Sequence, residues 1–275
     1  MIASIEASDF VPLSDWPTLE ELVAGFQEHI MPASSKLAGQ TFDHIFDMGL
    51  RISHQFHDSD TLTWRILEGD QAGVTGDAEY KAYEVRSGIY FVDFYKPDYK
   101  EQVSLILDTT TGQAIACVSG FSDQTNERRT WTKFSNATKN EGTNVKAYEA
   151  TEELIGKHIL YRYTPRDAYE HIYLNRGTLA WHCLSGTEKG LADAELCKML
   201  KLSDSLYLLF WTETIMPVES VVVVDLREMR STGRFFCWDP KPQREVQVRF
   251  GSYATILAET DPNKVLAKPI LHGRL

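Results

Sequence analysis

Residues that could carry out acid–base chemistry alternate along one stretch in the second half of the chain. Tyr169, His171 and Tyr173 occupy every second position of AYEHIYL. Such residues share one face of a β-strand, so the pattern predicts an imidazole among tyrosines. An imidazole can act as a general acid or base because its reference pKa lies near physiological pH. The alternative is a structural histidine that is hydrogen-bonded to a neighbouring backbone or hydroxyl group.

A second alternating stretch ends on a carboxylate. Tyr207, Trp211 and Glu213 fall on one face of LYLLFWTE. In an apolar cavity, burial would raise the pKa of Glu213 and prepare it to move a proton, whereas a position at the strand end would leave it solvated. We predict that His171 and Glu213 are catalytic and move protons. Tyr169 is the third predicted catalytic residue and would orient a polar group.

The other candidate site residues are aromatic or charged side chains in strand-like runs. Aromatic rings stack on flat ligands, and a charged group that faces inward must pair or bind a ligand. Charged members that face outward would have no such role. The predicted ligand-binding residues are Tyr173, Trp181, Trp211, Tyr207, Arg162, Lys198, His54 and Trp64.

Motifs of cofactor and metal chemistry are missing from the sequence. The chain contains no G-x-S-x-G, no Walker loop, no H-E-x-x-H and no G-x-G-x-x-G. His54 and His57 are near neighbours, but on a strand they would lie on opposite faces. We expect no cofactor and no metal, with ligands assembled from distant strands as the open alternative.

Composition and charge narrow the classes of partner. The 275 residues carry a formal net charge of -11 and contain no run of Lys and Arg, so we expect no nucleic-acid partner. No segment is apolar for about 18 residues and the N-terminus lacks a signal-peptide pattern, so we expect no membrane span and a cytoplasmic protein. The four cysteines form no C-x-x-C pair and are expected to be reduced.

The pattern of apolar and polar residues changes after Gly39. Before it, apolar residues from Leu19 to Ile30 recur at helical spacing and predict an amphipathic helix packed against a barrel, capped by Asp15 or Thr18. After it, short alternating runs broken by turn signals are typical of β-meanders. The predicted segments are a helical extension at 1–37, a first β-domain at 38–122, a linker at 123–152, a second β-domain at 153–240 and a tail at 241–275.

The two β-domains align as copies of one another. A shift of 117 residues places His54 on His171 and Trp64 on Trp181. A slip of one residue then aligns Asp77-Ala78-Glu79 with Asp193-Ala194-Glu195. Each meander must hide its end strands, and closure into a barrel does so. The sequence therefore predicts an all-β protein of two tandem antiparallel barrels.

Two stretches resemble the MoaF family. Residues 161–202, YRYTPRDAYEHIYLNRGTLAWHCLSGTEKGLADAELCKMLKL, are similar to its C-terminal domain, and LAGQTFDHIFDMGLRISHQF with DTLTW is similar to its N-terminal domain. The likeness covers residues 37–238 and is more specific in the second half. The resemblance implies two calycin-like (lipocalin-like) β-barrel domains and says little about a reaction.

Several functions fit these residues. The first is a cofactor-independent enzyme of the lyase, decarboxylase, isomerase or cyclase class that acts on a small aromatic or conjugated hydrophobic metabolite inside a barrel, by analogy with other calycin-like barrels. The second is a non-catalytic lipocalin-like carrier of such a molecule, and the third is a scaffold whose barrel is filled with side chains. Ile52 stands in the first repeat where Tyr169 stands in the second, which favours the second barrel as the site. Alternatively, both domains contribute and the site lies at their junction. A homodimer is left open.

Overall fold

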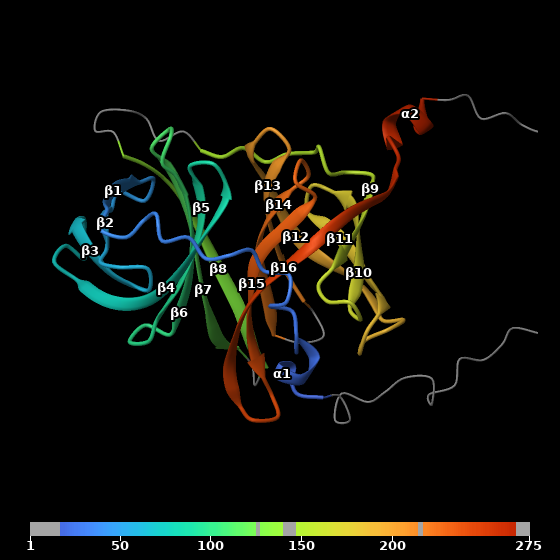
Figure 1. The fold of residues 1–275 in the computed structure, drawn as a ribbon, viewed down its shortest axis with the longest axis horizontal. Coiled ribbons are helices and arrows are strands. Elements are labelled where there is room, and N and C mark those ends of the chain that lie inside the picture. Colours follow the sequence, from blue (N-terminus) through green and yellow to red (C-terminus); the bar gives the residue numbers. More distant parts are fainter. Residues whose placement is uncertain (1–16, 125–126, 140–146, 214–216, 268–275) are drawn as a thin grey trace, which may run out of the picture.

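Two closed antiparallel barrels lie side by side (Figure 1). The computed structural model describes residues 17–124, 127–139, 147–213 and 217–267. The predicted all-β class and the two tandem barrels are confirmed, and each barrel has eight strands. No helix in the described part of the chain is long and apolar enough to cross a membrane.

The first barrel is a meander in which each strand pairs with the next and the last pairs with the first. Buried and less buried positions alternate along its early strands because one face of each strand lines the barrel interior. Its strands are β1 (Thr41–Phe46), β2 (Arg51–Phe56), β3 (Thr61–Glu68), β4 (Thr75–Arg86), β5 (Ile89–Lys96), β6 (Glu101–Asp108), β7 (Gln113–Gln124) and β8 (Glu127–Thr138).

The second barrel repeats this order and is closed by pairing of its last strand with its first. A short helix, α2 (Pro262–Leu266), follows it. Its strands are β9 (Lys157–Arg162), β10 (Ala168–Asn175), β11 (Thr178–Ser185), β12 (Ala192–Ser203), β13 (Leu206–Thr212), β14 (Val218–Asp225), β15 (Arg230–Asp239) and β16 (Arg244–Glu259).

Each barrel extends one strand beyond the predicted domain boundary. β8 lies in the predicted linker and pairs with β1, and β16 lies in the predicted tail and pairs with β9. Both boundaries are corrected, because without these strands each barrel would expose a row of unpaired backbone groups. Both strands are hard to recognise in the sequence because many of their outward-facing residues are polar. In β16, however, Val246, Val248 and Phe250 alternate inward. Outside the described residues lie parts of the predicted segments: 1–16 with the proposed cap Asp15, 125–126, 140–146, 214–216 and 268–275.

The N-terminal extension holds a much shorter helix than the spacing predicts. α1 (Leu19–Leu22) begins with a capping box in which Thr18 and Glu21 bond each other's backbone N–H groups. Gly25 then adopts a positive φ of 90°, which a right-handed helix does not contain. The predicted helix to Ile30 is therefore corrected to a single turn.

After α1 the extension runs along the second barrel and crosses to the first (Figure 1). The backbone N–H of Gly251 donates to the carbonyl of Phe26, and the Arg230 side chain donates to the carbonyl of His29. Farther along, the backbone N–H of Ser34 donates to the carbonyl of Ala82 in the first barrel. The extension thus contacts both barrels before β1 begins.

Apolar side chains form three clusters, one inside each barrel and one between them. β14 is buried at every position because one of its faces lines the second barrel and the other packs against the first. Between the barrels, the buried guanidinium of Arg234 pairs with Glu219 and donates to the hydroxyls of Ser104 and Ser119 at 2.9 and 3.0 Å. A buried charge requires such partners, so this network fixes how the barrels dock.

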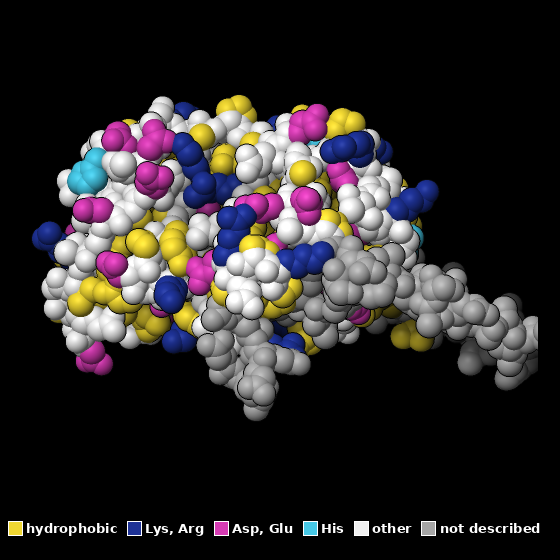
Figure 2. All heavy atoms as spheres, turned by 90° about the horizontal axis from the view of Figure 1, so that it is seen from below, with side chains coloured by type: hydrophobic (Ala, Val, Ile, Leu, Met, Phe, Trp, Pro, Cys, Tyr) yellow, Lys and Arg dark blue, Asp and Glu magenta, His cyan; other side chains and the backbone are white. Residues whose placement is uncertain are grey.

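Charged side chains of both signs are scattered over the surface. Figure 2 shows Lys and Arg interspersed with Asp and Glu on one face of the molecule. At the junction of the barrels, Arg86 donates from two nitrogens to the two carboxylate oxygens of Asp225, at 3.1 and 2.6 Å. Such a two-bond ion pair fixes the relative orientation of the groups as well as their distance.

The strand registers show that the repeat contains no slip in this region. Trp64 pairs with Gly76, and Trp181 pairs with Asp193. The two partners, Gly76 and Asp193, are 117 residues apart, as the two tryptophans are. The predicted alignment of Asp77 with Asp193 is therefore wrong. Because directly paired residues share a face of the sheet, Asp193 faces the same side as Trp181, and a glycine stands at its place in the first barrel.

Candidate ligand pocket of the second barrel

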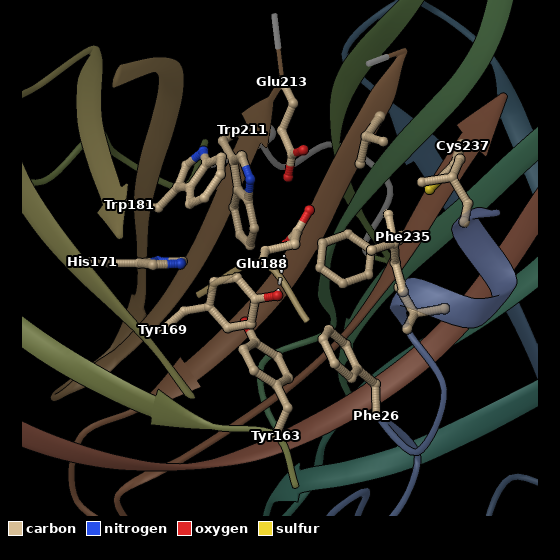
Figure 3. A pocket seen from close by; sticks show the side chains of 14 residues that line it. Phe26, Tyr163, Tyr169, His171, Trp181, Glu188, Trp211, Glu213, Phe235 and Cys237 are labelled. Carbon is tan, nitrogen blue, oxygen red and sulfur yellow. Dashed lines mark hydrogen bonds between the residues drawn. The ribbon is translucent and has the colours of Figure 1, made fainter. Parts of the chain in front are cut away.

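A pocket lies at the end of the second barrel that α1 covers (Figure 3). Side chains from β10, β11, β13, β14 and β15 line it, and α1 with Phe26 forms one wall. The cavity measures about 60 Å³. A water needs roughly 10–15 Å³ and a cavity that binds benzene is about 150 Å³. The cavity therefore accommodates a group of a few heavy atoms, and a larger ligand must extend through its open side.

Five of the predicted site residues line this pocket: Tyr169, His171, Trp181, Trp211 and Glu213. Strand alternation places the two β10 residues on the inner face, and the register pairs His171 directly with Trp181. The rings of His171 and Trp211 meet edge to face with centroids 5.1 Å apart. The structure thus brings together predicted residues from β10, β11 and β13, and Glu213 follows directly after β13.

Two predicted tyrosines are buried in the second barrel without lining the pocket. The hydroxyl groups of Tyr173 and Tyr161 share a hydrogen bond of 2.7 Å. The hydroxyl of Tyr207 donates to Glu153 at 2.7 Å. Both hydroxyls have protein partners, so their predicted role in ligand binding is replaced by one in holding the barrel together.

The two predicted cationic residues lie on the outer face of the second barrel. Arg162 and Lys198 are exposed, and the ammonium of Lys198 lies 5.1 Å from the centre of the Phe134 ring. Each is the sequence neighbour of an inward-facing residue, and strand alternation turns it outward. Their predicted place in the pocket is corrected.

His54 and Trp64, predicted from the repeat, belong to the core of the first barrel. His54 packs against Phe94 with ring centroids 6.1 Å apart. The ammonium of Lys96 lies over the ring of Trp64, 4.4 Å from the ring centroid. Both side chains pack the first barrel and do not reach the pocket.

Burial determines the charge of His171. The residue is only 4% exposed, and burial lowers the pKa of its imidazole to about 3. The ring is therefore neutral at physiological pH and cannot act as a cationic acid there. It remains a hydrogen-bonding group.

Two carboxyl groups face each other across the pocket (Figure 3). Burial first, and then the charges of Glu188 and Glu195, raise the pKa of Glu213 to about 8. Burial also raises the pKa of Glu188, whose Oε2 accepts a hydrogen bond of 2.6 Å from the Tyr169 hydroxyl. Two carboxylates in one apolar site cannot both ionise at low cost. At pH 7 the pair therefore retains a proton.

Several pocket residues escaped sequence reasoning. Glu188 sits in the turn-like stretch TEKG after β11, where an exposed side chain is the usual expectation. Phe26 lies in the extension, and its place in the wall follows only from the path of that segment. Tyr163, Phe235 and Cys237 also line the pocket. Tyr163 alternates with Arg162 and Thr164, but Phe236 and Trp238 flank Cys237, so polarity does not mark the inward face of β15.

Two polar atoms in the pocket wall have no hydrogen-bond partner among the residues that the structure describes. They are Nδ1 of His171 and the indole N–H of Trp181, and both are buried. Buried polar groups are normally satisfied, so these atoms are available to a bound molecule. Within the described ranges, no cluster of three or more His, Cys, Asp or Glu side chains is placed to hold a metal ion.

Comparison with known proteins agrees with this organisation. The family model of the MoaF N-terminal domain matches residues 14–123, and that of the MoaF C-terminal domain matches residues 148–260. The chain is also 29% identical to protein MoaF of Klebsiella aerogenes over 228 residues, which are 78% of this chain and 84% of that protein. The chain belongs to the MoaF family. The match to the MoaF C-terminal domain includes β16 and all the strands that line the pocket.

One solved structure with some likeness is a putative beta-lactamase from Burkholderia vietnamiensis. It is 13% identical, its match covers 40% of this chain and 99% of that chain, and the TM-score is 0.34. That score is too low to bear on the fold or function of the MoaF-family chain.

Proposed function

We propose that the second barrel binds a small aromatic or conjugated molecule and moves a proton on it without a cofactor. The observation that supports this function is the carboxyl pair of Glu188 and Glu213 in an aromatic pocket. An isolated carboxyl group is ionised at neutral pH, whereas this pair keeps a proton. A pocket that holds both a proton donor and a proton acceptor is suited to general acid–base catalysis.

The two carboxyl groups can take complementary roles. Glu213, with the pKa of about 8, is the proton donor. Glu188 is the acceptor, and the hydrogen bond from Tyr169 holds its carboxylate in place. The indoles of Trp181 and Trp211 provide flat apolar surfaces for a conjugated ligand. Removal of a proton at one atom and its delivery at another serve reactions of the isomerase, lyase, decarboxylase and cyclase classes.

A carrier without turnover is the second candidate. The observation that favours it is the wall formed by α1 and Phe26, which closes one side of the pocket. Phe26 stacks on Tyr163 with ring centroids 4.7 Å apart. A protein that stores and releases a ligand benefits from such a cover, and the carboxyl pair would then orient the ligand.

Native mass spectrometry of the purified full chain tests the function first, because a bound molecule adds its own mass. The molecule is then incubated with the protein, and products are followed by mass spectrometry. Glu213→Gln should lower turnover by roughly 10²–10⁴-fold while binding persists, since the amide cannot give up a proton in the same way. Glu170→Gln is the matched control, because this β10 carboxylate pairs with His182 and does not line the pocket.

The outcomes separate the two candidates. Turnover by Glu213→Gln at the wild-type rate would contradict the catalytic proposal. Binding by the wild-type protein without any product would favour the carrier.

A further inference from the structure

The two barrels carry a basic and an acidic side chain at one equivalent position. β5 and β13 begin 117 residues apart, at Ile89 and Leu206, and both pair with the next strand in the same register. Lys96 and Glu213 are also 117 residues apart. Lys96 ends β5, and Glu213 is the corresponding residue after β13. A lysine in the first barrel thus stands where a glutamate stands in the second.

In the first barrel, a lysine side chain lies against the aromatic rings at this position. The ammonium of Lys96 lies 4.4 Å from the centre of the Trp64 ring and 5.5 Å from that of Tyr99. It also pairs with the carboxylate of Glu101 at 3.3 Å. An ammonium is attracted to the electron-rich face of an aromatic ring, most strongly to an indole. The first barrel therefore supplies its own cation to its own indole.

The second barrel retains the indole and lacks the internal cation. Trp181 occupies the position of Trp64, and none of the described residues that line the pocket is Lys or Arg. Acidic residues face this region instead. Glu213 replaces the lysine, and Asp193 and Glu195 replace a glycine and an alanine of the first barrel.

We infer that the pocket of the second barrel binds an organic ammonium ion with a small flat apolar body. The negative charge that the pair of Glu188 and Glu213 carries beside its retained proton would pair with the ammonium, and the rings of Trp181 and Trp211 would face it. Nδ1 of His171 has no partner among the described residues, and in the tautomer protonated at Nε2 it would accept a hydrogen bond from an ammonium N–H. This inference rests on the proposed function, because it assumes that the pocket binds a ligand, and it specifies the class of that ligand.

The size of the cavity fits the assignment. A volume of about 60 Å³ accommodates an ammonium group and the first carbons attached to it. The rest of the ligand would extend through the open side, along the ring of Phe26. The Trp181 indole N–H, which also lacks a partner, would donate to an oxygen of the ligand or to a water.

Three probes with one ring and different charges test the inference on the full chain at pH 7. Benzylammonium, benzyl alcohol and benzoate are titrated by calorimetry, and the indole N–H signal of Trp181 is followed by NMR. Benzylammonium should bind at least tenfold more tightly than benzyl alcohol, and benzoate should not bind. Because the series uses the wild-type protein, the result does not depend on how any variant folds.

Glu213→Lys adds a second arm to the test. The substitution places in the second barrel the cation that the first barrel already has, and it should weaken benzylammonium binding at least tenfold. Lys96→Met, in the first barrel, should leave that binding unchanged. Circular dichroism and the remaining indole signals establish that each variant is folded.

The failures are distinguishable. Equal affinity for benzylammonium and benzyl alcohol would overturn the ammonium assignment and would leave the aromatic pocket of the proposed function standing. Absence of binding by all three probes would also overturn the assignment, and mass spectrometry of the co-purified molecule would then decide the proposed function alone. Unchanged benzylammonium binding in Glu213→Lys would show that the charge binds elsewhere.

Discussion

In the first barrel, Phe56 and Tyr80 pack against each other with ring centroids 4.9 Å apart, and both are fully buried. At the equivalent positions of the second barrel stand Tyr173 and Cys197. A cysteine fills much less space than a tyrosine, and Cys197 is only partly buried, whereas Tyr80 is 1% exposed. The comparison teaches that one strand framework can carry side chains of very different size at the same inward position, so its two copies need not be packed alike.

The two interiors also differ in charge. The first barrel encloses histidines and receives Lys96 at its aromatic end, whereas carboxyl groups gather in the second. Coulomb repulsion among these groups contributes to the raised pKa of Glu213. Strongly shifted pKa values are enriched at functional sites, and this difference is the reason that we propose the site in the second barrel.

The largest expected effect compares an aromatic residue from each barrel. Phe56→Ala should cost about 3–5 kcal/mol of the free energy of unfolding, because it leaves a dry cavity in a packed core. Phe26→Ala should cost roughly 1.5–3 kcal/mol, the transfer term alone, because water enters from the open side of the pocket. Urea unfolding measures both. Equal losses would mean that the second barrel is packed as tightly as the first.

The next effect concerns the dependence of stability on pH. The pKa of Glu213 is raised from its ordinary value of 4.5 to about 8, so the folded protein holds a proton that the unfolded chain releases between these values. The resulting contribution to stability is fully present below pH 4.5 and is lost as the pH rises through 8. Glutamine does not titrate in this range, so Glu213→Gln should gain stability relative to the wild type as the pH rises from 5 to 8.

Thermal or urea unfolding at several pH values measures this difference, in which the titrating groups that do not interact with Glu213 cancel. The ionisable groups near Glu213 are Glu188, Glu195, Asp193, Tyr163 and Cys237. A wild-type minus variant difference that stays constant across this range would contradict the raised pKa.

The smallest expected effect is on stability and comes from removing the charge of Lys96 in the first barrel. Lys96→Met removes the ammonium from the ring of Trp64 and keeps a side chain of similar length. Partly exposed cation–π contacts are worth about 0.5–1 kcal/mol, so the free energy of unfolding should fall by that amount. A gain in stability would indicate that the ammonium does not stabilise the indole, and the parallel with the second barrel would be lost.

Much of the fold was accessible from the sequence because strand alternation and the spacing of Trp64 and Trp181 are local patterns. The closing strands β8 and β16 were not, since barrel closure depends on pairing between residues about 90 apart in the chain. Five pocket residues could be predicted from alternation on two strands and from the repeated Trp. Glu188 could not, because its place in the pocket depends on the path of a loop.

Arg162 and Lys198 show the opposite error. Alternation assigns a residue to one of two faces, but charge alone does not say which face is inside. Their inward neighbours, such as Tyr161 and Met199, are the better guide, because long apolar side chains gather in the core. The predicted alignment of Asp77 with Asp193 likewise matched identical residues. The strand register instead keeps the constant spacing of 117 residues, which places Asp193 on Gly76.

Titration of the Glu213 side-chain carboxyl by ¹³C NMR tests the central claim most directly, with the signal assigned by its loss in Glu213→Gln. The account predicts a midpoint near pH 8 in the empty protein. It also predicts that the midpoint falls when benzylammonium is added, because a bound cation favours the carboxylate. A midpoint near the ordinary value of 4.5, unaffected by the ammonium, would contradict it.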